Sequence, residues 1–252
     1  MRQLLLGFFL VAVLVGGGLA QDAGDYTVNL GMNFSDQARK QPTFLNKETV
    51  PSKVEYWLRS DLSLRVQSTL LISRESLPKM RNTGRGDAIL GATYTLFDYD
   101  NDHPFGFSLD YQIKFPTAIK GLGSDQTDHQ VTGTLYRTFS KGRLYTEFDG
   151  GAYIAGQQGR SDISTAQFSL VEIVGLGKAP AKGKAYKWKL LNETDYSPAA
   201  AGSPTSIVQI NQIIRVFSPV WSIRFGPNYA ITPYDSRFGF AAGIQYKGHF
   251  GK

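Results

Sequence analysis

The amino-acid sequence predicts an all-β protein, an up-and-down antiparallel transmembrane β-barrel of about twelve strands. Long segments alternate apolar and polar residues, and the connections between them alternate between short and long. The chain is also rich in aromatic residues and glycine and lacks cysteine, with 16 Phe, 13 Tyr and 27 Gly among 252 residues. A barrel with a polar lumen and an apolar outer band accounts for a mean hydropathy of only −0.22.

Residues 1–20 are predicted to form a secretory signal peptide. A charged start, Met1-Arg2-Gln3, precedes an apolar run over residues 4–15, and Gly18-x-Ala20 supplies a small-residue cleavage site. The apolar run is shorter than the roughly 20 residues of a membrane-spanning helix. Residues 21–252 are therefore expected to be exported and to form a single barrel domain in the bacterial outer membrane.

The charge pattern gives no sign of a nucleic-acid partner. Lysine and arginine number 27 against 21 acidic residues, a net charge of +6, and the excess is spread along the chain rather than collected in a tail. The absence of cysteine excludes disulfides and thiolate chemistry.

Strands are predicted wherever alternation is sustained. From Phe105 to Phe115, FGFSLDYQIKF places aromatic and aliphatic residues on one face and Gly, Ser, Asp, Gln and Lys on the other. A tilted strand that crosses a bilayer needs about 9–11 residues, which such segments supply. The predicted strands are 26–34, 50–60, 62–73, 87–99, 105–116, 128–140, 143–156, 163–177, 185–196, 206–217, 220–231 and 237–250.

The connections indicate which end of the barrel is which. Those at Ser60-Asp61, Lys141-Gly142 and Ser218-Pro219 are tight, whereas 35–49, 74–86 and 117–127 are long and polar. Outer-membrane barrels have short periplasmic turns and longer extracellular loops. The long connections are therefore predicted to be extracellular, and both termini periplasmic.

Aromatic residues gather near the predicted strand ends, as in the girdles that such barrels place at the lipid headgroups. Examples are Tyr186, Tyr196, Trp221 and Tyr229. The last strand ends on Phe250, two residues before the terminus, and resembles the C-terminal signal that the outer-membrane insertion machinery reads. A soluble β-sandwich or lipocalin-like barrel is the alternative, although its strands would not need this length.

The tripeptide Arg85-Gly86-Asp87 has the letters of an adhesion motif. We interpret it instead as the entry to a strand, because an adhesion tripeptide needs an exposed loop tip and this one directly precedes an alternating segment. Gly84 and Gly86 are expected to supply backbone freedom where the long loop turns into the strand. Asp87 is expected to begin the inward face.

Three stretches lie in order along the chain: GRGDAILGATYTL at 84–96, KFPTA at 114–118 and GLGSDQTDHQ at 121–130. They resemble the bacterial family of small outer-membrane barrels named for the meta-pathway of phenol degradation (MetA-pathway) and often described as transporters. The resemblance covers roughly half of the chain at the level of motifs. It implies a barrel in the outer membrane, and it connects the chain with phenolic compounds only by association.

The residues offer little support for catalysis. Histidine occurs only at His103, His129 and His249, and no Gly-x-Ser-x-Gly motif is present. An outer-membrane lipid hydrolase with a serine nucleophile remains the enzyme alternative. The acidic run from Asp98 to Asp102 lacks the glycine and distal glutamate of a calcium loop, so we interpret it as a solvated turn and expect no metal and no cofactor.

The predicted inward faces carry charges of both signs. In a barrel of twelve strands such residues can form ion pairs across a narrow lumen, which disfavours a wide general porin. The candidate lumen-lining residues are Arg65, Asp110, Lys114, Glu147, Asp149, Lys187, Lys189, Glu193, Arg215, Arg224 and Lys247.

The predicted function is passive passage or binding of a small molecule, with aromatic and hydrophobic solutes as candidates, and not an enzymatic reaction. The expected partners are outer-membrane lipid, the insertion machinery and the solute, and the barrel is expected to be a monomer. The alternative from another class is a non-conducting structural or surface-interaction barrel whose ion pairs close the lumen.

Overall fold

The computed structural model describes residues 22–36, 46–76, 80–99, 102–119, 122–123, 125–156, 163–181, 184–199, 204–233 and 237–250. The predicted signal peptide lies outside these ranges. Among the described residues, none of the helical structure is both long enough and apolar enough to cross a membrane.

Thirteen strands and one turn of 3₁₀ helix make up the described secondary structure. The strands are β1 (Asp25–Asp36), β2 (Asn46–Arg59), β3 (Leu62–Ser76), β4 (Met80–Gly84), β5 (Ala88–Phe97), β6 (Gly106–Phe115), β7 (Asp128–Phe139), β8 (Leu144–Ala155), β9 (Ile163–Leu176), β10 (Trp188–Ser197), β11 (Ser206–Val216), β12 (Trp221–Ala230) and β13 (Phe238–His249), and the helix is η1 (Ser140–Gly142).

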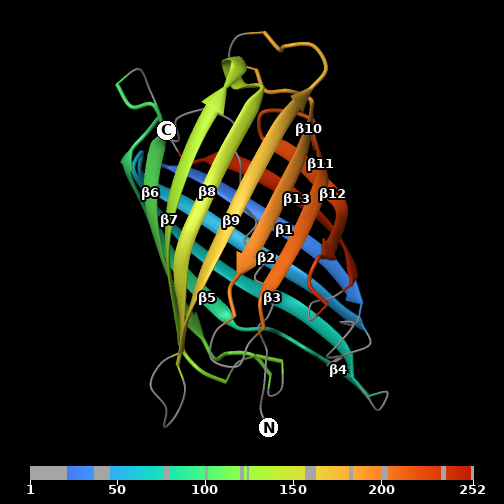
Figure 1. Ribbon diagram of the computed structural model, residues 1–252. Helices are drawn as coiled ribbons and strands as arrows, with labels where there is room; N and C mark the ends of the chain where they lie inside the picture. Colours follow the sequence, from blue (N-terminus) through green and yellow to red (C-terminus); the bar gives the residue numbers. More distant parts are fainter. Residues whose placement is uncertain are drawn as a thin grey trace.

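Twelve of these strands form a closed antiparallel barrel, as the alternation predicted (Figure 1). Each strand of the barrel pairs with the strands before and after it in the sequence, except that β3 pairs with β5. Strand β4 pairs only with the end of β3 and is not part of the wall. The first and last strands also pair with each other, from Asp25 opposite His249 to Ser35 opposite Gly239, and this ladder closes the sheet. An up-and-down barrel therefore has no free strand edge in its wall.

The tight turns after β2, β7 and β11 lie at one end of the barrel, the upper end in Figure 1, together with the longer connection between β9 and β10. We call it the turn end. The turn at Ser60-Asp61 is held by a hydrogen bond of 2.8 Å from Arg59 Nε to Asp61 Oδ1. This hydrogen bond from Arg59 holds the pKa of the Asp61 carboxyl below its usual value. The opposite, loop end carries the connections that begin after β1, β3, β6, β8, β10 and β12.

Residues 74–86, predicted to be a long polar connection, are largely strand in the structure. The structure extends β3 to Ser76 and pairs its final residues with β4, from Ile72 opposite Gly84 to Ser76 opposite Met80. The β4 side chains are mostly exposed. This hairpin therefore continues β3 beyond the barrel wall at the loop end, as the lower right of Figure 1 shows.

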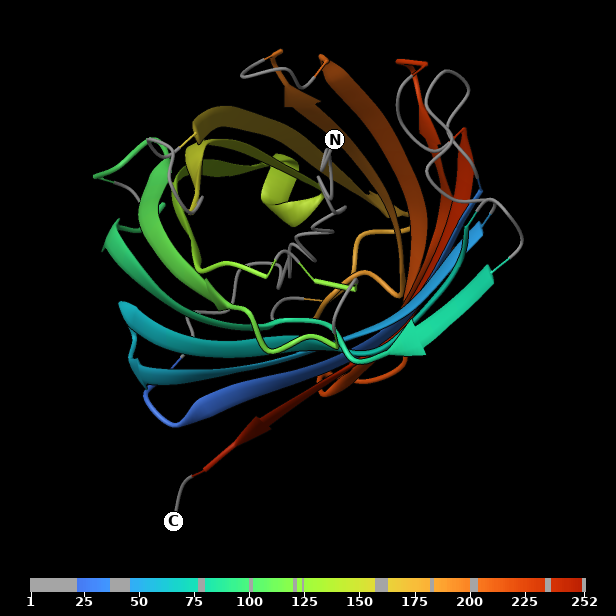
Figure 2. The same cartoon turned by 90° about the horizontal axis from the view of Figure 1, so that it is seen from below.

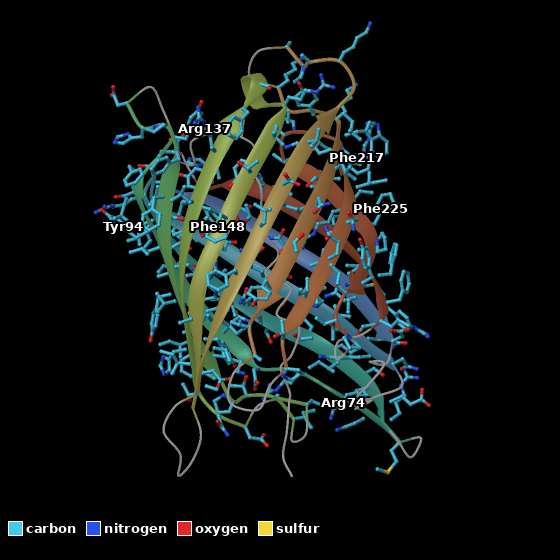
Figure 3. The ribbon with its side chains drawn as sticks, in the orientation of Figure 1. Arg74, Tyr94, Arg137, Phe148, Phe217 and Phe225 are labelled. Atoms are coloured by element: carbon cyan, nitrogen blue, oxygen red, sulfur yellow. The ribbon has the colours of Figure 1, made fainter. Side chains whose placement is uncertain are left out.

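The outer face of the barrel is mostly apolar. Tyr94, Phe148 and Phe225 point outward from different parts of the wall (Figure 3), and Val66 and Met32 remain 54% and 68% exposed. An apolar area of this extent is typical of a barrel whose outer band faces lipid. One predicted girdle residue is an exception, because Tyr186 is buried against Gly175.

We expect Val66→Lys to destabilise the folded barrel. Val66 lies midway between Leu62 and Leu70 on β3, and a lysine on the lipid side of a barrel strand costs about 2–4 kcal/mol near the bilayer centre. Urea unfolding in lipid vesicles, followed by gel mobility, measures the effect. Asn33→Lys is the matched control, since Asn33 is half-buried on the inner face. Equal unfolding midpoints for the two variants would contradict the assignment of the outer face.

Candidate functional site

Nine of the eleven predicted lumen residues occupy inward positions. On β6, for example, Ser108, Asp110, Gln112 and Lys114 are buried while the alternate Leu109 remains exposed. The same alternation places the other charged side chains inside the barrel wall. The nine are Arg65, Asp110, Lys114, Glu147, Asp149, Lys189, Glu193, Arg224 and Lys247.

The other two lie elsewhere. Lys187 is exposed in the turn before β10 rather than within the strand. Arg215 lies on the outer face of β11, where its guanidinium is 4.6 Å from the ring centroid of Trp188 and 5.7 Å from that of Phe217. Strand β11 turns Val208, Ile210 and Gln212 inward, so Arg215 lies on the opposite side from the one predicted.

An Arg65–Asp110 pair joins two strands of the inner wall. Arg65 Nη2 lies 2.8 Å and 2.7 Å from the two carboxylate oxygens of Asp110. The Thr93 hydroxyl and the Gln112 amide also donate to Asp110, at 2.7 Å and 2.8 Å. Four donated hydrogen bonds compensate a carboxylate that is buried inside the wall, and they fix it in one orientation.

The carboxylates of β8 and β10 form a second inner feature, which we call the acidic wall: Glu147, Asp149, Glu193 and Asp195. Register places Glu147 and Glu193 on one row, and Asp149 and Asp195 on the next, with one residue of β9 between the members of each pair. Like charges at such spacing favour a cation or a neutral group over an anion nearby.

Beside the acidic wall lies an inner apolar cluster formed by five buried residues. The cluster comprises Val171, Ile173, Leu191, Val208 and Ile210, and Tyr145 and Ile214 pack against it. An apolar patch on the inner face is unusual for a barrel whose other inward residues are polar. The interior of β9–β11 therefore supplies apolar surface next to charge.

The segment after β6 is tethered at the loop end of the barrel. The Ala118 N–H donates to Asp87 Oδ1 at 3.0 Å, and the Ala88 N–H donates to Thr117 Oγ1 at 2.8 Å. The backbone of Ile119 also bonds to that of Arg85 at 3.2 Å. Figure 2, which looks at the barrel from this end, shows the described residues between β6 and β7 lying inside the ring of strands.

Glycines make this close packing possible. A Cβ on Gly84 would lie 2.5 Å from Ile119 Cδ1, and one on Gly123 would lie 2.6 Å from Asp87 Oδ1. The described glycines with positive φ are Gly24, Gly142 and Gly177, so the expectation of unusual backbone freedom at Gly84 and Gly86 was wrong. Gly84 instead leaves room for Ile119, and Gly86 leaves room for Thr69 of β3.

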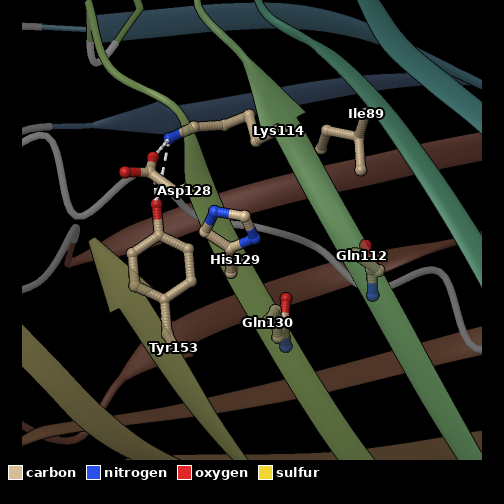
Figure 4. Close-up of a pocket in the computed structure, with 7 residues that line it drawn as sticks. All are labelled: Ile89, Gln112, Lys114, Asp128, His129, Gln130 and Tyr153. Atoms are coloured by element: carbon tan, nitrogen blue, oxygen red, sulfur yellow. Dashed lines mark hydrogen bonds and ion pairs between the residues drawn. The ribbon is translucent and has the colours of Figure 1, made fainter. Parts of the chain in front are cut away.

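Lys114, Asp128 and Tyr153 lie at this end of the barrel, where β6 and β8 end and β7 begins. Figure 4 shows that their side chains form a cluster. Lys114 forms an ion pair with Asp128 and donates to the Tyr153 hydroxyl at 2.9 Å. The Tyr153 hydroxyl donates in turn to Asp128 at 2.5 Å. The cavity beside the cluster has room for about one water molecule, so the cluster acts as a fixed part of the wall rather than as a solute pocket.

The three sequence stretches that were singled out therefore meet in space. Asp87 belongs to the first, Lys114 and Thr117 to the second, and Gly123 and Asp128 to the third. Their contacts join β5, β6, β7 and the segment between β6 and β7. We call this set the mouth clamp. The sequence indicated the stretches but not their contacts, because these depend on how the segment folds back.

Other inner residues were not singled out from the sequence. Glu55 accepts from the Ser63 hydroxyl at 2.8 Å and pairs with Lys53 at 3.2 Å. Lys53 and Glu55 lie on β2, where Pro51 interrupts the alternation of apolar and polar residues that identifies inward positions. Asp195 was also missed, although its parity with Glu193 would have placed it inside.

The three histidines lie in separate places. His129 accepts or donates a hydrogen bond of 2.8 Å with the Tyr111 hydroxyl on the outer side, and His249 contacts Asp25 at 2.7 Å near the turn end. His103 stacks on Phe97 with ring centroids 5.2 Å apart. Within the described residues, no three His, Asp or Glu side chains come together as metal ligands.

Comparison with known proteins gives likeness at the level of fold. No protein-family model matches the chain, and no curated protein matches it. Among solved structures, the chain is similar to the COG4313 outer membrane channel from Pseudomonas putida F1, with a TM-score of 0.67, 11% identity, and 93% and 97% of the two chains covered. It is also similar to the KdgM porin in complex with disordered oligogalacturonate, with a TM-score of 0.60, 8% identity, and 88% and 99% covered.

Proposed function

We propose that this chain is a passive outer-membrane channel for a small solute with an apolar part, aromatic molecules being the first candidates. The observation that carries the proposal is the composition of the inner wall, where the acidic wall lies beside the inner apolar cluster. Such a surface offers an amphipathic solute a polar contact at the acidic wall and an apolar contact at the inner apolar cluster. The similar folds of two outer-membrane channels support the location and the class.

The charges narrow the range of solutes. A polyanion such as the oligogalacturonate named with the KdgM porin would meet four carboxylates on the acidic wall. A neutral or cationic solute would not be repelled there. We therefore favour neutral or cationic small molecules, and the mouth clamp would limit their size at the loop end.

The proposal includes how the chain reaches its membrane. Residues 1–20 would direct export and be removed, and residues 21–252 would form the single barrel domain. The insertion machinery would read the final strand, where Phe250 is 68% exposed and stacks on Tyr26 at 4.4 Å. Transport would be passive, because the sequence contains no nucleotide-binding motif.

Other function classes are less well supported. A soluble β-protein would not expose this much apolar surface on its outer face. A serine hydrolase needs a histidine beside its nucleophile, whereas His129 contacts Tyr111 and His249 contacts Asp25. A non-conducting structural barrel is the main competitor, since ion pairs such as Arg65–Asp110 occupy the interior.

Single-channel recording in planar bilayers separates the channel from the structural barrel. We expect small, resolvable current steps from the purified chain. Liposome swelling with a series of small sugars then gives the size limit. A barrel that is correctly folded, shown by heat-modifiable gel mobility, but gives neither current nor swelling would rule out the channel.

The double variant Glu147→Gln/Asp149→Asn tests the acidic wall. We expect the unmodified channel to prefer potassium over chloride, and the variant to lose most of that preference, because two carboxylates of the wall become neutral amides. The reversal potential in a potassium chloride gradient measures the change. Glu48→Gln is the control, since that carboxylate lies at the exposed loop end of β2. Equal reversal potentials in both variants would remove the acidic wall from the mechanism.

A further inference from the structure

The outer face of β9–β11 carries a group of polar residues, whereas most outward residues elsewhere in the wall are apolar. Arg137 on β7 and Thr146 on β8, which lie opposite each other, are exceptions. Glu172 lies opposite Asn192, and Asn192 lies opposite Asn211, so the three form one row across the strands. Thr194 and Gln209 form the next row. We call these five residues the outer polar patch. The strands that carry it are at the front of Figure 1.

The patch lies at mid-height in the wall rather than at its rim. On β10, Asn192 is midway between Trp188 and Tyr196, which share its face and are 43% and 39% exposed. Four residues of strand span about 13 Å, so each aromatic residue lies about that far along the strand from Asn192. A membrane that contacts both aromatic residues would place the patch near the middle of its apolar layer.

The patch does not come from a shift in strand phase. On the outer face of the same strands, Leu170 lies two positions from Glu172 and Leu190 two positions from Asn192, and both leucines are exposed. The inward residues of the same strands form the inner apolar cluster. The usual distribution is therefore reversed locally, with apolar side chains inside and polar side chains outside.

The patch meets only part of its hydrogen-bonding capacity. Gln209 Nε2 donates to Asn192 Oδ1 at 2.6 Å, Asn192 Nδ2 donates to Asn211 Oδ1 at 3.4 Å, and the Thr194 hydroxyl donates to Gln209 Oε1 at 3.3 Å. Among the described residues, the Glu172 carboxylate and Asn211 Nδ2 have no partner. Lipid tails supply no donors or acceptors, so these groups need another macromolecule.

A sideways opening in the wall would not explain the patch. All ten residues of β10 have register partners on β11, and nine have partners on β9. The ladders on both sides of Asn192 are therefore complete, and the polar side chains stand on a continuous wall.

The chemistry of the patch fits a second copy of itself. Amide side chains carry a donor and an acceptor, so Asn192 can pair with the same residue of a partner across a two-fold axis. The free acceptor, Glu172, and the free donor, Asn211, lie one strand to either side of Asn192. A two-fold axis along the membrane normal turns the Glu172 side of each copy toward the Asn211 side of the other.

We propose that the outer polar patch is the interface of a homodimer in the membrane. Polar side chains between membrane-spanning elements act as contacts that lipid cannot replace. A partner with a single cationic group would satisfy Glu172 and leave the amides unpaired. This proposal departs from the monomer expected from the sequence and does not depend on whether the barrel conducts.

Cysteine cross-linking tests the dimer directly, because the chain has no cysteine of its own. We expect Asn192→Cys, treated with a short bismaleimide in the membrane fraction of producing cells, to give a major band at twice the monomer mass. Val66→Cys on the opposite wall is the matched control and should give little of it. Thr194→Cys, in the same patch, is the second variant if Asn192→Cys lacks heat-modifiable mobility.

The outcomes are decisive in either direction. No more dimer from the patch cysteines than from Val66→Cys would overturn the proposal, as would a cross-link only to a protein of another mass. A second readout uses Glu172→Leu/Asn211→Leu in the Asn192→Cys background. We expect the dimer band to fall at least severalfold while the folded mobility is kept, because a purely structural patch would lose folding rather than pairing.

Discussion

Replacing Asp87 with alanine is expected to raise the single-channel conductance severalfold. Asp87 accepts the Ala118 N–H at 3.0 Å and so holds the segment after β6 inside the loop end. A hydrogen bond to a charged group contributes about 1.5–3 kcal/mol. Loss of this hydrogen bond shifts the equilibrium between the tethered and the released segment by roughly tenfold or more. A released segment obstructs less of the barrel opening at the loop end.

Two further variants act on the same clamp by different means. Thr117→Val removes the oxygen that accepts the Ala88 N–H. Gly84→Ala inserts a methyl group 2.5 Å from Ile119 Cδ1 and 2.9 Å from Leu122 Cδ1, which pushes the segment away without changing any charge. Both are expected to increase conductance in planar bilayers, and a shared increase would attribute the effect to the segment rather than to Asp87 itself.

The control must remove a carboxylate from the loop end without loosening the clamp. Asp125→Asn does this, because Asp125 is exposed and has a φ of 55°, a conformation that asparagine tolerates. Its conductance should stay at the level of the unmodified chain. If Asp87→Ala and Gly84→Ala both conduct no better than Asp125→Asn, the segment is not what limits flow.

The strands could be predicted because alternation is a local signal. In β6 every second residue is buried and the pattern is unbroken, so both the strand and its inward face follow from the sequence. Strand β4 escaped prediction because its side chains are mostly exposed and it pairs only with the end of β3. Its existence depends on a neighbour rather than on its own pattern.

The site was less predictable than the fold for two physical reasons. In β11, Ile207, Val208, Ile213 and Ile214 put apolar residues on both faces, so the phase that assigns Arg215 to one side is ambiguous. The mouth clamp needs a segment to fold back on two strands, and no periodicity encodes such a contact. The three quoted stretches mark its residues only because they were compared with a family of barrels.

The buried Arg65–Asp110 pair is where a single substitution should cost the most stability. Both side chains are buried in the inner wall, and their ion pair is 2.7 Å. Arg65→Met leaves Asp110 charged and without its main partner, and loss of one member of a buried pair costs about 3–5 kcal/mol. Urea unfolding in vesicles, followed by heat-modifiable mobility, should report a loss of that size.

The double variant Arg65→Met/Asp110→Asn separates the pair from its members. With the carboxylate neutral, no buried charge remains unpaired, so most of the lost stability should return. The exposed pair of Arg59 and Asp61 supplies the comparison, because its side chains are 63% and 31% exposed. Arg59→Met should cost much less stability than Arg65→Met, because water screens an exposed ion pair.

A glycine next to Arg65 makes room for the ion pair in the inner wall. Gly91 lies beside Arg65 on the neighbouring strand, and a Cβ there would be 2.9 Å from Arg65 Nη2. The missing side chain at Gly91 thus leaves space for the guanidinium, which from there reaches Asp110. Gly91→Ala should therefore destabilise the barrel in the presence of Arg65 but much less in the double variant. Equal costs in both backgrounds would mean that the glycine serves the strand and not the ion pair.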